Sequence, residues 1–159
     1  MGIYLVDISA SNWARDERAP LLNEALAARG LPPCPRPSTT AAEAFEEKIV
    51  PPMDAFTELC ARHDTTEAFG ALLIVPADFT GLIELPIASN IDDVTTVSSA
   101  YRIREAITRM AAEVSPPTGL PTGPMALTTA ITDPLLFYVA LFHRAAEYSL
   151  RHSRPLDYV

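Results

Sequence analysis

Lysine and glycine are scarce in this 159-residue chain, and each shortage argues against a class of protein. Lys48 is the one lysine among 12 basic residues, which stand against 20 acidic ones, so the formal net charge is −8 at pH 7. Nucleic acids and anionic membrane surfaces attract clustered Lys and Arg, so neither is an expected partner. Glycine occurs six times without a G-x-x-x-x-G-K-[S/T] or G-x-G-x-x-G motif, which argues against a phosphate-binding loop.

Cysteine and long hydrophobic runs are scarce too. Two cysteines, Cys34 and Cys60, are too few for a disulfide scaffold. A bond between them stays open, but the apolar helical stripe around Cys60 favours a buried, reduced thiol. No apolar run reaches the roughly 18 residues of a transmembrane helix. The N-terminus lacks a basic segment and a small-residue cleavage site, so we expect a cytoplasmic protein.

What is present fits one folded domain spanning residues 1–159. The chain is 48% hydrophobic and 20% charged, whereas disordered chains are poor in apolar residues and rich in charge. This length is about that of one average domain, and no internal repeat or convincing linker divides it.

Hydrophobic periodicity and capping residues predict the secondary structure. We expect strands at 3–8, 71–75 and 82–85, the last two forming an antiparallel hairpin, and a short strand at 125–128. We expect helices at 20–30, from Thr40 to the prolines at 51–52, from there to His63, at 96–114 and at 134–152. Thr40 and Glu43 form the capping box of the second helix, and Asp133 and Pro134 begin the last one.

The predicted fold class is α+β or α/β. A small mixed sheet is covered by amphipathic helices, with the apolar 134–152 helix as a central, buried element. The expected core consists of Leu5, Leu73, Val75, Ile83, Ile107, Met110, Phe137 and Leu141.

One motif brings together side-chain oxygens that could bind a metal ion. Asp7, Ser9 and Ser11 read D-x-S-x-S straight after the first strand, which resembles the metal-adhesion motif of von Willebrand A-type domains. The resemblance covers five residues and implies a Mg²⁺ site that needs a second carboxylate, for which Asp78 is the candidate. This reading requires strands 3–8 and 71–75 to be adjacent and parallel. The alternative, which we favour, is a strand end at which Ser11 caps a short helical turn through Trp13.

Two helical pairs could carry acid–base or thiol chemistry. Cys60 and His63 lie at i, i+3 on one face, and His143 and Glu147 lie at i, i+4. Both pairs are also ordinary helix features, a core thiol beside a C-terminal histidine and a surface ion pair, and we favour those interpretations.

The function hypothesis rests on the absence of catalytic signatures and on the acidity. We expect a non-enzymatic protein that binds a basic protein partner through Asp78, Asp92 and Asp93, which all lie in predicted loops. Immunity and antitoxin proteins, which neutralise a partner, often share this acidic single-domain composition. The alternative is a small Mg²⁺-dependent enzyme or metal-binding domain that uses Asp7, Ser9, Ser11 and Asp78. A third possibility is a homo-oligomer formed along the heptad-like seam of helix 96–114.

Overall fold

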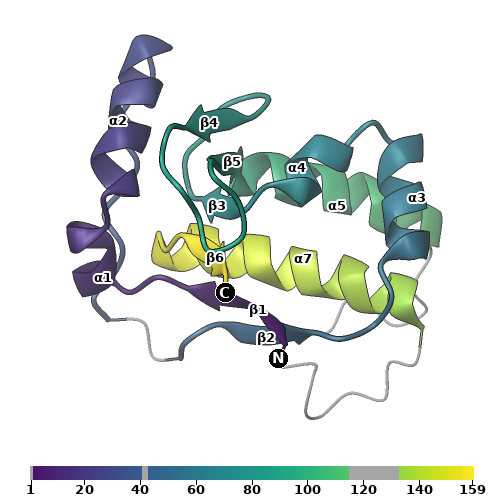
Figure 1. Ribbon diagram of the computed structural model, residues 1–159. Helices are drawn as coiled ribbons and strands as arrows, with labels where there is room; N and C mark the ends of the chain where they lie inside the picture. The colour runs from purple at the N-terminus through teal and green to yellow at the C-terminus, as the bar shows by residue number, and fades with distance from the viewer. Residues whose placement is uncertain (1, 41–42, 115–132) are drawn as a thin grey trace.

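A six-stranded mixed sheet forms the middle of the molecule (Figure 1). The computed structural model describes residues 2–40, 43–114 and 133–159. The strands are β1 (Ile3–Asp7), β2 (Glu46–Ile49), β3 (Leu73–Val75), β4 (Ile83–Leu85), β5 (Thr95–Ser99) and β6 (Leu156–Tyr158). The helices are α1 (Ala10–Arg15), α2 (Arg18–Ala28), α3 (Asp54–Arg62), α4 (Thr66–Gly70), α5 (Ala100–Val114) and α7 (Pro134–His152). The strand order is β2-β1-β6-β3-β5-β4, and among these strands only β3 and β5 pair in parallel. The α+β class is confirmed.

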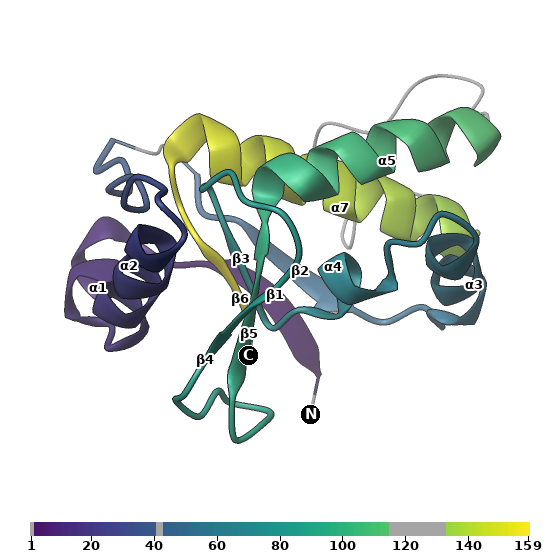
Figure 2. The ribbon, with the colours of Figure 1, turned by 90° about the horizontal axis from the view of Figure 1, so that it is seen from above.

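Two hydrophobic cores lie on opposite faces of the sheet. Ile74 belongs to the core beneath α3, α4, α5 and α7, whereas its neighbours Leu73 and Val75 belong to the core beneath α1 and α2. Figure 2 shows the sheet between these two groups of helices. Successive strand residues point to opposite faces, so β3, which is covered on both faces, is apolar throughout. All eight expected core residues are buried.

Helix α7 is the central helix that its sequence predicts. The Asp133 side chain accepts a hydrogen bond from the Leu135 N–H at 2.9 Å, and Pro134 occupies the first helical position. Nine of its residues, from Phe137 to Ser149, are buried. Helix α3 also lies where it was expected, and Gly30 follows the end of α2 with a φ of 73°, a conformation that glycine adopts without strain.

The predicted hairpin of the second and third strands is wrong. Strand β5 lies between β3 and β4, pairing in parallel with the first and antiparallel with the second. The expected helix 96–114 begins only at Ala100. The residues before it belong to β5, because the β-branched run from Thr95 to Val97 suits a buried strand. Asp92 and Asp93 consequently precede a strand instead of a helix.

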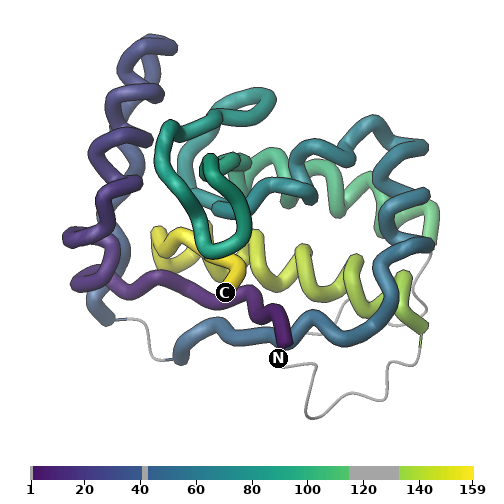
Figure 3. The backbone as a smooth tube through the Cα atoms, in the orientation of Figure 1, coloured from purple at the N-terminus to yellow at the C-terminus, as the bar shows by residue number. Residues whose placement is uncertain are grey.

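The predicted helix from Thr40 to the prolines at 51–52 is also wrong. Residues 46–49 form the edge strand β2, in which Glu46 and Lys48 are exposed while Glu47 is buried. This period-two alternation is that of a strand, and residues 46–49 form a strand because they pair antiparallel with β1. A local capping pattern cannot reveal that pairing. Strand β6 was not predicted, and the expected strand at 125–128 lies outside the described residues, which are the coloured parts of the tube in Figure 3. No helix in the described part of the chain has the length and apolar character needed to cross a membrane.

Candidate functional site

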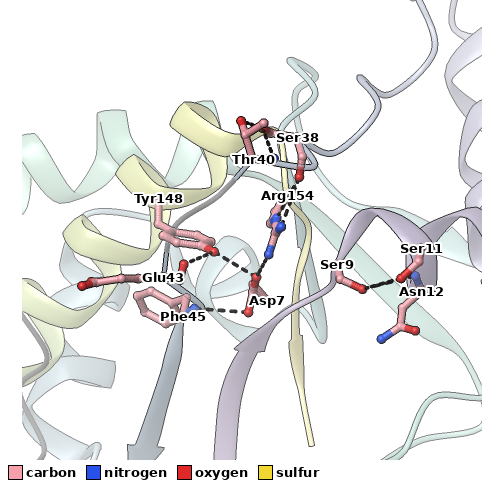
Figure 4. A network of polar contacts seen from close by, with 10 residues as sticks. All are labelled: Asp7, Ser9, Ser11, Asn12, Ser38, Thr40, Glu43, Phe45, Tyr148 and Arg154. Atoms are coloured by element: carbon pink, nitrogen blue, oxygen red, sulfur yellow. Dashed lines mark hydrogen bonds and ion pairs between the residues drawn. The ribbon is translucent and has the colours of Figure 1, made fainter.

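Asp7, the first residue of the D-x-S-x-S motif, is a hub of hydrogen bonds at the end of β1 (Figure 4). Its Oδ2 accepts from the Arg154 guanidinium at 2.6 Å and from the Tyr148 hydroxyl at 2.9 Å. Its Oδ1 accepts from the backbone N–H of Phe45 at 3.1 Å. Both carboxylate oxygens are therefore already engaged by donors of this chain.

The partners of Asp7 come from two other segments of the chain. Arg154 also donates to the backbone oxygen of Ser38 at 3.1 Å, and the Tyr148 hydroxyl lies 2.8 Å from the Glu43 carbonyl oxygen. Burial raises the pKa of Tyr148 to about 12, and the hydrogen bond to Asp7 acts in the same direction. The hydrogen bond to Asp7 likewise raises the pKa of Arg154. The network thus joins β1, the end of α7 and the segment leading into β2 through groups that keep their protons at neutral pH.

The two serines of the motif serve α1. Ser9, not the predicted Ser11, is the N-cap, and its Oγ accepts from the Asn12 N–H at 3.3 Å. The Ser11 hydroxyl lies 3.3 Å from that of Ser9, and Figure 4 shows this pair apart from the contacts of Asp7.

The fourth proposed magnesium ligand lies elsewhere. Asp78 follows β3, and β6 separates β3 from β1, so the two strands are not adjacent as the magnesium reading requires. Asp78 instead pairs with Arg102 of α5 at 2.7 Å. Within the described ranges, no group of three or more His, Cys, Asp or Glu side chains could hold a metal. Asp7, Ser9, Ser11 and Asp78 therefore do not fit one magnesium ion.

Asp92 and Asp93 lie on the connection between β4 and β5, and both are exposed. Ser89 orders this loop: its Oγ accepts from the Asp92 N–H at 2.9 Å, and its N–H donates to the Asp92 carbonyl at 2.8 Å. Ile91, beside the two acids, is 56% exposed. In the part of the chain that the structure describes, neither carboxylate has a cationic partner within 4.0 Å.

Among the described residues, no hydrogen bond or ion pair joins Cys60 to His63 or His143 to Glu147. Cys60 is buried, which raises the pKa of its thiol to about 11, while His63 faces Glu113 of α5 with an Nε2–Oε2 distance of 2.5 Å. Glu147 lies 3.9 Å from Arg104.

Sequence reasoning did not identify the two arginines that hold the candidate acids Asp78 and Asp7. Arg102 bridges Asp78 and Glu105, of which only the i,i+3 partner has a local signal. Arg154 reaches Asp7 across 147 positions, and no spacing rule covers such a distance.

Comparisons with protein-family models, curated proteins and solved structures gave no match.

Proposed function

We propose that this protein acts by binding a basic protein partner, and that the loop between β4 and β5 makes the first contact. The proposal rests on how exposed Asp92 and Asp93 are and on their lack of an ion pair among the described residues. Both carboxylates are exposed on an ordered loop and lack an ion-pair partner in the described residues. Unpaired surface charges attract an oppositely charged partner over distances of about 8 Å at physiological salt.

Several other acids of the chain are less available because each is held in an ion pair. Asp7 and Asp157 pair with Arg154 and Arg18 at buried positions. Asp78 is exposed, but its contact with Arg102 offsets its charge. We therefore assign the leading role to Asp92 and Asp93 and a smaller one to Asp78. Ile91 adds apolar surface beside the two leading acids.

Affinity capture from the native cell tests the proposal. The baits are the wild-type protein, the Asp92→Asn/Asp93→Asn variant and a matched variant, Glu46→Gln/Glu58→Gln. The control removes the same charge from exposed sites on β2 and α3, and β2 is the strand at the opposite edge of the sheet from β4.

A basic protein should be captured in stoichiometric amount by the wild type and the control and be depleted on the Asp92→Asn/Asp93→Asn bait. Equal recovery on all three baits would show that the loop is not the contact site.

A further inference from the structure

A polar cleft of about 400 Å³ lies beside α5, away from the loop of Asp92 and Asp93. Ser98 and Ser99 of β5 line it, together with one side of α5, the start of α4 and the turn at Thr80 and Gly81. Small-molecule sites have volumes of roughly 300–1,000 Å³. The cleft includes the carboxyl end of β5, one strand of the parallel pair, and ligands of open α/β sheets bind outside such strand ends.

Two buried polar groups of the cleft lack a hydrogen-bond partner among the described residues. Ser98 is 1% exposed, and its Oγ is unpaired. The Nε of Arg102 is also buried and unpaired, although the two terminal nitrogens of that guanidinium bind Glu105 and Asp78. Buried polar groups in folded proteins nearly always have a partner, so two unpaired groups at one cavity point to a polar ligand.

Beside the ion pair of Arg102 and Glu105, the cleft is lined by charges of both signs that have no ion pair among the described residues. Arg109 of α5 is exposed and has no ion pair in the described residues, and the same holds for Asp64 and Glu67 at the start of α4. A simple anion would meet Asp64 and Glu67, and a simple cation would meet Arg109. A ligand that carries both charges satisfies both sides.

We propose that this cleft binds a small zwitterion of the free amino acid class. Its carboxylate pairs with Arg109, and its ammonium group pairs with Glu67 and Asp64. A polar atom of its side chain extends toward the hydroxyl of Ser98. This inference is independent of the proposed partner binding, because it uses none of the loop residues.

Isothermal titration calorimetry with the twenty free L-amino acids tests the proposal. For each amino acid that binds, the corresponding amine without the carboxylate and the acid without the amine are titrated as well. We expect at least one amino acid to bind and both analogues to bind more weakly. Arg109→Gln and Glu67→Gln should each raise the Kd about ten-fold or more, because each removes a charge-assisted hydrogen bond.

The control variants are Arg36→Gln, an exposed arginine outside the cleft, and Asp92→Asn/Asp93→Asn. Both should bind the amino acid as the wild type does. The inference is wrong if no amino acid of the panel binds, if a single-charge analogue binds equally well, or if Arg109→Gln leaves the Kd unchanged.

Discussion

Replacing Asp7 by Asn removes one charge from a nearly buried ion pair while keeping the shape of the side chain. The Asp7 and Arg154 side chains are 7% and 11% exposed and lie 2.6 Å apart. Breaking a buried pair costs about 3–5 kcal/mol because the remaining charge is left without its partner. Arg154 keeps its contact with the Ser38 carbonyl, so we expect the lower end, about 3 kcal/mol. In a domain of this size that lowers Tm by roughly 6–12 °C.

Urea unfolding of Asp7→Asn, Arg154→Met and the double variant measures this cost. The coupling energy between the two sites should reach at least about 1 kcal/mol, because the second change removes a charge that the first has already left unpaired. Asp78→Asn is the matched control: its pair with Arg102 is 59% and 37% exposed, and such surface pairs contribute about 0–1 kcal/mol. A cost for Asp7→Asn no larger than that of Asp78→Asn would refute the reasoning.

Three further predictions concern the core, a helix cap and the thiols. Leu141 is fully buried, so Leu141→Ala should lower the free energy of unfolding by about 2–5 kcal/mol, and a loss under about 0.5 kcal/mol in urea unfolding would contradict its place in the core. Asp133→Ala should cost about 0.5–2 kcal/mol in the same assay, because the Leu135 N–H loses its acceptor; an unchanged stability would show that the cap contributes nothing. Burial raises the pKa values of Cys34 and Cys60 to about 12 and about 11. At pH 8 the fraction of Cys60 present as thiolate is then on the order of one in a thousand. A thiol reagent should therefore react only when the protein unfolds, and rapid labelling of the native protein would contradict this prediction.

Elements with strong local signals could be predicted from the sequence. Helix α7 combines an Asp-Pro start with a long apolar face, and α3 and the helical part of α5 show regular apolar spacing. Strand β1 is a short β-rich run. Each signal lies within one element, so no knowledge of the rest of the fold is needed.

Elements defined by distant pairing could not be predicted. The segment before β2 has the local pattern of a helix start, with Thr40 and Glu43 as capping residues. Residues 46–49 nevertheless pair with β1, and Glu47 forms an ion pair with Arg144. Strand β6 has three residues and is held by β1 and β3 on its two sides. Such pairings join residues far apart in the chain, and the hydrophobic pattern of one segment does not show with which distant strand it pairs.

The candidate residues divide in the same way. The sequence placed Asp78, Asp92 and Asp93 in loops, and the structure has them exposed outside the strands and helices. It did not reveal that Arg102 pairs with Asp78, or that Tyr148 and Arg154 bind Asp7, since these contacts span 24, 141 and 147 positions. The oxygen ligands of the D-x-S-x-S motif were consequently interpreted without their internal partners.

The salt dependence of the association rate tests the proposed electrostatic binding most directly. Surface-based kinetics would compare the wild type with Asp92→Asn/Asp93→Asn against the captured basic partner at several salt concentrations. Because long-range attraction acts mainly on association, the double variant should associate more slowly and respond less to salt, with a nearly unchanged dissociation rate. The same association rate and the same salt response in both proteins would contradict the account.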